Sequence, residues 1–519
     1  MPTFSIVTPV YNTPVKALKA CAKSVRKQTF TDWEWCIVND CSTQPRVARM
    51  LNRLAAKDSR IRVMHRSTNG GIVAASQDGL DMATGEFIAL LDHDDKLAVR
   101  ALKRISEELK SDESIDYVYT DEDKIDAKGR HYDAFRKPTF DPVRLRGQNY
   151  CCHFSVFRAS LLDQIGGFRS GFDGSQDYDL ILRVTERARK VVHIPRILYH
   201  WRVVPGSAAG DVHAKPYAYD AGKRAVESHF ERAHIAVDIT KLNPGSYQHR
   251  FSDESGSFAP RVSIVIPTRG DRSRIWGAAM CMVENAVEHI LAHTEYQNFD
   301  IVIVRDVNTD GSVVYPFDLP AAHNISYVDF YGPFNIAAKW NSGVLASSGE
   351  VVVLLDDDTQ ITSPDWLTQI IGQFQFGTTG IVGPMLLMAD GRVSSAGIST
   401  SPRIRHIANG KSGTQPGFMG NLSVARNATG VSGACMAFRR SLFDELGGFS
   451  ERYLFDHADL DFCLKARMHG LETVWTPEAR VYHFGAQTRR EQQNPHDLRR
   501  FSARWGRYIG ADPYTGHTA

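Results

Sequence analysis

The strongest constraint on this chain is an internal repeat. Residues 5–9 read SIVTP and residues 263–267 read SIVIP, and the run LLDHDD at 90–95 returns as LLDDD at 354–358. A Gly-Gly-Phe string, an Asp-x-Asp pair and a Tyr-His pair then follow in the same order in both halves. Landmarks repeated in one order predict two copies of a single domain. Because most of the repeated residues are carboxylates and a histidine, the duplication concerns chemistry as well as packing.

The bulk composition is that of an ordinary globular chain. A chain of 519 residues is longer than a single hydrophobic core usually supports, so more than one domain is expected. The 61 Lys and Arg nearly balance the 59 Asp and Glu, which gives no global reason to expect nucleic acid as a partner. No apolar run approaches the roughly 18–20 residues that span a bilayer, and the N-terminus lacks the pattern of a secretory signal. The eight cysteines include no Cys-x-x-Cys pair, so we expect reduced thiols in a cytoplasmic protein.

Strand and helix patterns alternate along both copies. This alternation predicts βαβ units, and hence an α/β fold with a mainly parallel central sheet in each copy. In the first copy the expected strands are 4–7, 34–38, 61–65 and 87–91, and the expected helices are 15–27, 45–57 and 73–84. In the second copy the expected strands are 262–266, 300–304, 325–328 and 351–355.

Composition also indicates where the copies meet. Residues 241–260 are rich in Pro, Gly and Ser, which is typical of a linker. In the C-terminal tail, Phe501, Trp505 and Tyr508 have helical spacing, which favours a helix packed on the second domain over a helix on a membrane surface. We expect a first domain at 1–240, the linker at 241–260, a second domain at 261–490 and a helical tail at 491–519.

Both acidic clusters fall at the carboxyl end of an expected strand, where open α/β sheets bind their ligands. Adjacent carboxylates repel one another unless a cation lies between them, and oxygen ligands of this kind suit Mg²⁺ or Mn²⁺ that bridges to phosphate. A solvated acidic turn is the alternative for one cluster, but its repetition favours a site. A further acidic run at 121–123 follows an expected strand at 117–119. We expect it to be an exposed turn, with binding of acceptor sugar or a second cation as the alternative.

The repeated strings resemble those of family 2 glycosyltransferases, which have the Rossmann-like GT-A fold of nucleotide-diphospho-sugar transferases. In the first copy the matching strings are TPVYN (8–12), NDCS (39–42), NGGI (69–72), LDHDD (91–95), TDEDK (120–124), GSQDYD (174–179) and YHWR (199–202). In the second they are IPTR (266–269), FNIAA (334–338), NSG (341–343), DDD (356–358) and DLDFCL (459–464). The whole chain resembles the tandem members tied to bacterial surface-polysaccharide assembly of the O-antigen type.

The resemblance implies roles for particular residues. It implies a Mn²⁺ or Mg²⁺ ion on the nucleotide diphosphate, held by two carboxylates of a DxD motif and a late histidine: Asp92, Asp94 and His200 in the first copy, and Asp356, Asp358 and His483 in the second. It implies nucleotide-sugar contacts from Thr8, Pro9, Tyr11, Asp40, Asn69, Gly71 and Asp92, and from Thr268, Asp306, Asn335, Asn341 and Asp356. It also implies Asp177 and Asp459 as the catalytic bases.

The chemistry requires one carboxylate at each base position. In an inverting transfer a base deprotonates the acceptor hydroxyl as that oxygen attacks the anomeric carbon opposite the departing nucleotide, and a metal offsets charge on the diphosphate. Asp177 and Asp459 lie near expected helix starts, so helix capping is the alternative role. Gln77 stands where the family usually has asparagine, and this departure puts a donor contact in question.

These expectations combine into a bifunctional, metal-dependent, inverting glycosyltransferase that moves sugars from nucleotide-sugars to hydroxyls of a growing glycan. The acceptor is expected to be a polysaccharide on a lipid carrier, with a protein acceptor left open. We expect no nucleic-acid partner and no transmembrane segment, and a location in the cytoplasm or peripherally at the inner face of the cytoplasmic membrane. One catalytic copy beside a carbohydrate-binding or scaffolding copy is the alternative. A nucleotidyltransferase would share the sheet and the metal but release pyrophosphate.

Overall fold

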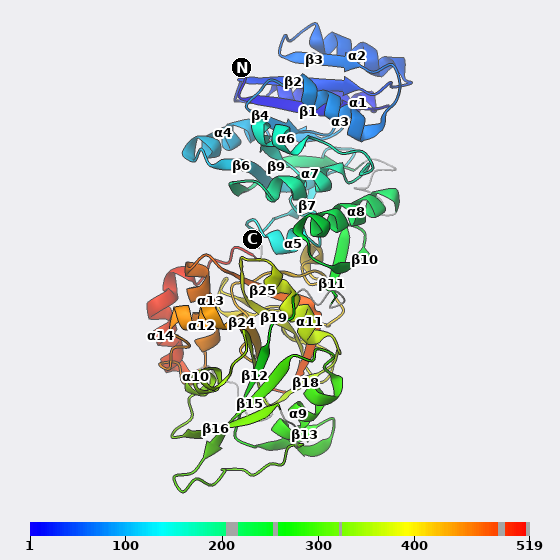
Figure 1. Cartoon of the computed structure of the whole chain (residues 1–519). Helices are drawn as coiled ribbons and strands as arrows, with labels where there is room; N and C mark the ends of the chain where they lie inside the picture. Colours follow the sequence, from blue (N-terminus) through cyan, green and yellow to red (C-terminus); the bar gives the residue numbers. More distant parts are fainter. Residues whose placement is uncertain (204–215, 253–257, 321–323, 486–493, 515–519) are drawn as a thin grey trace. The chain divides into compact units, whose positions relative to one another are not determined.

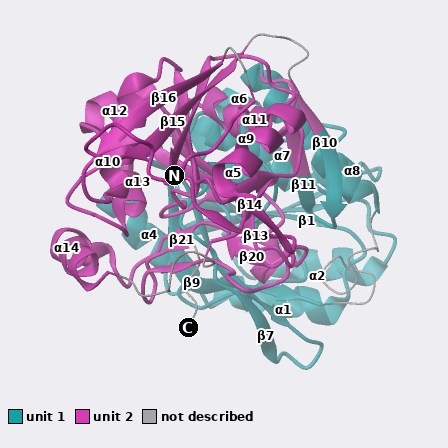
Figure 2. Ribbon diagram, turned by 90° about the horizontal axis from the view of Figure 1, so that it is seen from below, with its two compact units in different colours: residues 1–234, 239–247, 516–519 teal, residues 235–238, 248–515 magenta. Residues whose placement is uncertain are grey.

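The computed structural model describes residues 1–203, 216–252, 258–320, 324–485 and 494–514. The described residues divide into two compact units, coloured separately in Figure 2. Residues 1–234 and 239–247 belong to unit 1, and residues 235–238 and those from 248 onward belong to unit 2. The chain passes between them through β10 (Val237–Asn243) and β11 (Ser246–Phe251), so the expected linker at 241–260 contains a strand.

Unit 1 is an α/β structure built on one sheet of nine strands (Figure 1). The strands are β1 (Phe4–Val10), β2 (Trp33–Asn39), β3 (Ile61–His65), β4 (Phe87–Leu90), β5 (Lys96–Leu97), β6 (Ile115–Ile125), β7 (His131–Phe135), β8 (Val156–Arg158) and β9 (Lys190–Arg202). The helices are α1 (Val15–Arg26), α2 (Pro45–Ala55), α3 (Gly71–Met82), α4 (Ala101–Ser111), α5 (Pro142–Leu145), α6 (Ala159–Ile165), α7 (Gln176–Thr185) and α8 (Pro216–Ala233). The strand order is β3-β2-β1-β4-β8-β6-β9-β5, with β7 paired to β6.

Unit 2 is built on a sheet of ten strands with smaller two-stranded ribbons beside it. The strands from β12 onward are β12 (Val262–Thr268), β13 (Arg272–Ile275), β14 (Ala278–Cys281), β15 (Phe299–Val307), β16 (Ile325–Tyr331), β17 (Val351–Leu355), β18 (Thr359–Ile361), β19 (Thr379–Leu387), β20 (Val393–Ser395), β21 (Ile398–Ser399), β22 (Arg405–His406), β23 (Arg426–Asn427), β24 (Cys435–Arg439) and β25 (Glu472–His483). The helices are α9 (Met282–His293), α10 (Ile336–Ala346), α11 (Trp366–Gly372), α12 (Arg440–Leu446), α13 (Ala458–Met468) and α14 (Pro495–Trp505).

The two sheets have the same topology. The unit 2 order is β16-β15-β12-β17-β24-β19-β25-β18, which matches the unit 1 order strand for strand. In both, the first four strands are parallel, the fifth is antiparallel to its neighbours, and the sixth and seventh are parallel to each other. The predicted α/β fold with two tandem copies is therefore confirmed.

A glycine in each copy lets a helix approach the sheet closely. A Cβ on Gly79 of α3 would lie 2.7 Å from Val7 of β1, and a Cβ on Gly343 of α10 would lie 2.3 Å from Val265 of β12. Both distances are shorter than carbon atoms tolerate, so only glycine fits without displacement. The equivalent contact in both units shows that the repeat extends to side-chain packing.

The acidic run at 121–123 lies where the sequence did not predict it. β6 continues through these residues to Ile125, and Asp121, Glu122 and Asp123 are buried. The expectation of an exposed turn is therefore wrong. Basic side chains explain the burial, because a buried carboxylate requires paired or hydrogen-bonded neighbours. Lys137 contacts Glu122, and histidines contact the two aspartates.

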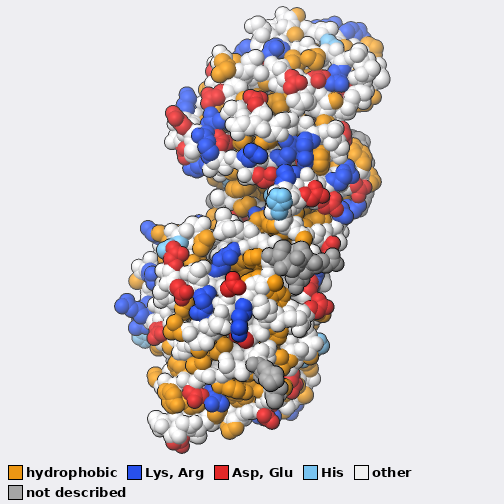
Figure 3. All heavy atoms as spheres, viewed as in Figure 1, with side chains coloured by type: hydrophobic (Ala, Val, Ile, Leu, Met, Phe, Trp, Pro, Cys, Tyr) orange, Lys and Arg blue, Asp and Glu red, His pale blue; other side chains and the backbone are white. Residues whose placement is uncertain are grey.

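The tail helix, the cysteines and the surface charges can also be compared with the sequence predictions. Phe501 and Trp505 are buried in the core of unit 2, as the spacing of the tail helix predicted. All eight cysteines are free thiols. No helix in the described ranges combines the length and apolar character that crossing a membrane requires. Lys and Arg side chains are interspersed with Asp and Glu over the face shown in Figure 3.

Candidate active sites

The acidic clusters occupy equivalent positions at the carboxyl ends of β4 and β17. Leu90 pairs with β1 as Leu354 pairs with β12, so Asp92 and Asp356 follow their strands at the same distance. The next short strands begin at Lys96, opposite His200, and at Thr359, opposite His483. The first copy thus has one extra residue in this turn. Directly before the short strand, Asp95 rather than Asp94 takes the place of Asp358.

Unit 2 gathers the three residues that the sequence predicted as metal ligands. The ligand atoms of Asp356, Asp358 and His483 all lie within 4.8 Å of one another, with His483 Nε2 3.4 Å from Asp358 Oδ1. Although burial opposes its charge, the Asp358 carboxylate and its neighbours raise the pKa of His483 to about 9. Burial and the charge of Asp358 raise the pKa of the adjacent Asp357 to about 7. Crowded negative charge of this kind favours a bound cation.

Unit 1 gathers a different set. The ligand atoms of Asp92, Asp95 and His153 lie within 4.8 Å of one another, and His153 Nε2 is 3.9 Å from Asp92 Oδ2. Asp95 accepts hydrogen bonds of 2.6 Å from the Tyr199 hydroxyl and from the backbone N–H of Arg202. Burial and the charge of Asp92 raise the pKa of Asp95 well above its usual range. Asp94 instead lies 3.4 Å from the ring of His93.

Sequence reasoning missed His153. It precedes β8, and the strand register places Ala434 at the corresponding position of unit 2, so the repeat gave no signal for it. Its Nδ1 lies 3.2 Å from Glu122 Oε2, and its ring stacks on Tyr199 with centroids 4.4 Å apart. The buried Lys137 holds Glu122 at 2.9 Å. His153 is therefore fixed beside the acidic cluster from two directions.

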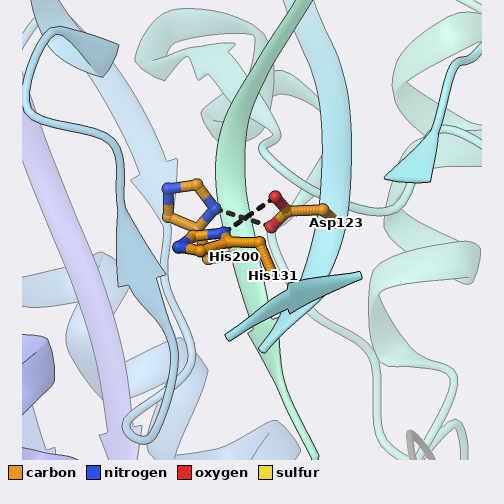
Figure 4. Close-up of side chains that lie close together, drawn as sticks. All are labelled: Asp123, His131 and His200. Carbon is orange, nitrogen blue, oxygen red and sulfur yellow. Dashed lines mark hydrogen bonds and ion pairs between the residues drawn. The ribbon is translucent and has the colours of Figure 1, made fainter. Parts of the chain in front are cut away.

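His200 belongs to a separate cluster with Asp123 and His131, drawn in Figure 4. His200 Nδ1 is 2.6 Å from Asp123 Oδ1, and His131 Nδ1 is 2.9 Å from Asp123 Oδ2. The structure therefore does not bring His200 together with the carboxylates of Asp92 and Asp94, although His200 pairs with Lys96 in the sheet.

The two predicted bases occupy equivalent places in the first turns of α7 and α13. Asp177 is half-buried and accepts hydrogen bonds from the Asn149 amide at 2.9 Å and from the Cys152 thiol at 3.5 Å. Asp459 is half-buried and accepts one from the backbone N–H of Gly433 at 3.0 Å. The charge of Asp177 acts on Asp92, which puts the base near the acidic cluster.

The neighbouring aspartates have structural partners. Asp179 is buried and pairs with Arg169 and with Arg183 on the next turn of α7. Asp461 is buried, lies 3.3 Å from Lys465 and accepts a hydrogen bond of 2.7 Å from the Trp505 indole. The second carboxylate of each Asp-x-Asp pair thus anchors its helix, while the first is half-buried at the helix start.

Three of the predicted nucleotide contacts of unit 1, Asp40, Asn69 and Gly71, meet at the start of α3. Both carboxylate oxygens of Asp40 accept backbone N–H groups, from Gly70 at 2.8 Å and from Gly71 at 2.9 Å. Asn69 donates to the Asp40 carbonyl at 3.0 Å. Thr8 is buried and accepts from the Trp35 indole, Pro9 is half-buried, and Tyr11 is exposed. Asp40 therefore shapes the turn at which α3 begins.

In unit 2 a buried lysine replaces those amide contacts. Lys339 Nζ lies 2.6 Å from Asp306 and donates to the backbone carbonyl of Thr268 at 3.1 Å. Thr268 also donates its hydroxyl to Asp357 at 2.6 Å, which connects β12 to the acidic cluster. Asn335 caps α10 by accepting the N–H of Ala338.

Asn341 and Gln77 perform the same structural task. The Asn341 side chain accepts the backbone N–H of Phe449 and donates to its carbonyl, both at 2.9 Å. The Gln77 side chain accepts the N–H of Phe168 at 2.8 Å. Each pins the Gly-Gly-Phe segment to its own helix, α3 or α10, so glutamine in place of asparagine keeps the hydrogen bond from the phenylalanine N–H.

Comparison with known proteins identifies the repeated unit. A family model described as glycosyl transferase family 2 matches residues 5–166 and again residues 263–447. An uncharacterized protein y4gI of Sinorhizobium fredii is 37% identical over 529 aligned residues, covering 99% of this chain and 57% of that protein. The O-antigen biosynthesis protein RfbC of Myxococcus xanthus is 31% identical, covering 99% of this chain and 39% of that protein. The chain thus spans only part of the length of these relatives.

Two further matches cover less of the chain. Chondroitin synthase of Pasteurella multocida is 31% identical over 207 residues, which is 40% of this chain and 21% of that protein. Among solved structures, S. aureus TarS 1-349 in complex with UDP-GlcNAc is 19% identical with a TM-score of 0.37, covering 44% of this chain and 66% of that one.

Proposed function

Because the chain belongs to glycosyl transferase family 2, in two tandem copies, we propose that each unit is an inverting glycosyltransferase site of the GT-A type. The donor is a nucleoside-diphosphate sugar and the acceptor is a hydroxyl of a growing glycan. One observation carries the proposal. In each unit two aspartates that follow a central strand lie close to a histidine, and a further aspartate lies in the first turn of a helix. The match to an O-antigen biosynthesis protein supports a surface polysaccharide as the acceptor class.

The donor sets fit a divalent cation such as Mn²⁺ or Mg²⁺. Asp356, Asp358 and His483 would hold it in unit 2, and Asp92, Asp95 and His153 in unit 1, with Asp94 close by. Burial and the charges of neighbouring carboxylates raise the pKa values of Asp95 and Asp357, and a bound cation would offset this crowded negative charge. When bound, such an ion offsets the charge that develops on the leaving diphosphate.

Asp177 and Asp459 would act as general bases. Each takes the proton from the acceptor hydroxyl while that oxygen forms its bond to the anomeric carbon, and the bond from that carbon to the nucleoside diphosphate breaks. Asn149 and Cys152 hold Asp177 through one oxygen, and Gly433 holds Asp459. Each carboxylate thus accepts a hydrogen bond that orients it for this step.

Two sites in one chain suit two successive or alternating sugar additions, because the product of one site stays near the other. The alternative, one catalytic copy beside a carbohydrate-binding copy, predicts a single active unit. The acidic group and the base candidate are present in both units, which favours two.

The test uses Asp177→Asn and Asp459→Asn, each serving as the other's control. Purified protein is given nucleotide-sugars and an acceptor glycan with Mn²⁺ or with a chelator, and nucleoside diphosphate and glycan products are measured. We expect metal-dependent release, with each variant losing a different sugar addition by about 10²-fold or more while nucleotide affinity stays unchanged. Loss of the same addition in both variants would support one composite activity. A wild-type rate in both would refute the base assignments.

A further inference from the structure

Asp123, His131 and His200 come from three strands and converge on one point (Figure 4). Asp123 lies on β6 directly opposite His200 of β9, and His131 begins β7, which pairs with the end of β6. One carboxylate oxygen faces each imidazole, at 2.6 Å from His200 Nδ1 and 2.9 Å from His131 Nδ1. The two rings meet edge to face with centroids 4.5 Å apart. All three ligand atoms therefore lie on sheet positions whose register is fixed.

We propose that these three side chains form a second cation site in unit 1, separate from the acidic cluster, that takes a borderline transition metal such as Zn²⁺. Two imidazoles and one carboxylate are a donor set that Zn²⁺ accepts with a fourth position left for water. Mg²⁺ and Ca²⁺ prefer all-oxygen sites, so this donor set discriminates against the ion expected at the diphosphate. The site does not depend on the proposed transfer reaction.

The geometry needs only small adjustments to accept an ion. The three ligand atoms lie within 4.8 Å of one another, and zinc bonds of about 2.0–2.2 Å place ligand atoms about 3–4 Å apart. Binding exchanges the two hydrogen bonds to Asp123 for metal bonds. An imidazole that ligates a metal through Nδ1 carries its proton on Nε2.

Exposure gives the ion a route to the site. The side chain of His131 is 46% exposed, whereas Asp123 and His200 are 9% and 14% exposed. Asp123 and His200 would bind the ion on the protein side, and His131 would bind it on the solvent side. A carboxylate that is largely buried beside two imidazoles is better protected from water than an ordinary surface ion pair.

The second unit shows that the fold does not require this cluster. There Leu387 pairs with Tyr482, as Glu122 pairs with Tyr199, so the next residue, Met388, takes the place of Asp123. His483, which corresponds to His200, instead contacts Asp358 at 3.4 Å. The same topology thus exists with and without the triad, which argues against a role in fold maintenance alone.

An ion at this position would couple the β6–β7 hairpin to the proposed active site. It would tie β7 to β9, and β9 carries Tyr199, whose hydroxyl contacts Asp95 and the backbone of Asp92. The site would therefore steady the strand on which the acidic cluster of unit 1 rests.

The test is zinc titration of the full chain by calorimetry after metal removal, in excess Mg²⁺ to occupy the oxygen-rich sites. Co²⁺ absorption then reports the coordination of the ion. His131→Asn removes an exposed ligand without threatening the fold. His469→Asn is the matched control, because His469 is 44% exposed and also lies 2.9 Å from a carboxylate, Glu445, but without a second histidine in that pair.

We expect the wild type to bind one equivalent of zinc in the presence of excess Mg²⁺. The affinity for this zinc should fall at least about tenfold in His131→Asn and stay within about twofold in His469→Asn. Loss of outer partners alone costs about 10–100-fold in metal affinity, so loss of a ligand costs no less. Asp123→Asn should weaken the same equivalent, with circular dichroism checking its fold. Zinc affinity unchanged in His131→Asn, or absent from the wild type in Mg²⁺, would overturn the proposal and leave a hydrogen-bonded triad only.

Discussion

Lys137→Met tests whether the buried network under His153 stabilises unit 1. Lys137 is 1% exposed, and its ammonium group contacts Glu122 Oε2 at 2.9 Å and the carbonyl oxygens of Cys151 and His153. Methionine is similar in length but has no charge, so the variant removes these bonds and leaves the packing largely filled. Glu122 then stays buried with His153 as its remaining charged partner in the network.

The pKa of Glu122 sets the size of the effect. Although burial opposes ionisation, Lys137 and His153 lower the pKa of Glu122 from 4.5 to about 2. At about 1.4 kcal/mol for each pKa unit this corresponds to about 3 kcal/mol of stability, shared between the two partners. Removing one partner of a buried pair typically costs about 3–5 kcal/mol. We therefore expect unit 1 to lose about 3–5 kcal/mol at pH 7.

The sign of the pH dependence follows from the same shift. A carboxyl group whose pKa is lowered in the folded state contributes its stability above the unfolded value of 4.5, and this contribution is lost as the pH falls toward 2. The penalty of Lys137→Met should therefore be largest near neutral pH and shrink as the solution is acidified through pH 4.5.

Hydrogen exchange with mass spectrometry measures this loss, because peptides from β6 and β9 report unit 1 separately from unit 2. The control is Lys124→Met on β6, the strand that carries Glu122, where Lys124 contacts Asp133 in an ion pair that is 26% and 49% exposed. Such exposed pairs are worth less than about 1 kcal/mol. Equal losses in the two variants, or a Lys137→Met penalty that is the same at pH 7 and pH 4, would refute the reasoning.

Three further substitutions test contacts in unit 2. Gly343→Ala places a Cβ 2.3 Å from β12, so overpacking should cost about 1–3 kcal/mol in urea unfolding, and an unchanged midpoint would contradict the close approach. Asn341→Ala removes both bonds to the Phe449 backbone and should cost about 1–3 kcal/mol, read as a lower thermal midpoint. Trp505→Phe leaves the buried Asp461 without its indole donor and should cost a similar amount, whereas a neutral effect would mean that water replaces the bond.

The parallel half of each sheet could be predicted because its signals are local. The expected strands 61–65 and 351–355 match β3 and β17 at both ends, and the other expected strands differ by a few residues. Apolar runs between helical patterns carry that information without any knowledge of distant contacts. β6 could not be read this way, because its second half is acidic and is stabilised by Lys137 and by histidines far along the chain.

In the candidate sites, too, some residues could be predicted from the sequence and others could not. Asp356, Asp358 and His483 could be grouped because each has a repeated counterpart, and the structure brings them together. His153 could not be found, because Ala434 stands at its position in unit 2. The grouping of His200 with Asp92 and Asp94 assumed that the two copies complete their clusters alike. One extra residue before β5 instead puts Asp95 in the place of Asp358, and His200 pairs with Asp123.

The two clusters take their histidine from different parts of the fold, so substitutions can affect one site and not the other. In unit 2 the histidine of the cluster comes from β25, which is part of the sheet that supports the acidic turn. In unit 1 it comes from the segment before β8 and contacts Glu122, which Lys137 holds and whose place in unit 2 is taken by Leu387. A substitution in the Glu122–Lys137 pair can therefore alter the first site through contacts that the second site does not share. The shared fold fixes where chemistry takes place, while the side chains that complete each site are free to differ.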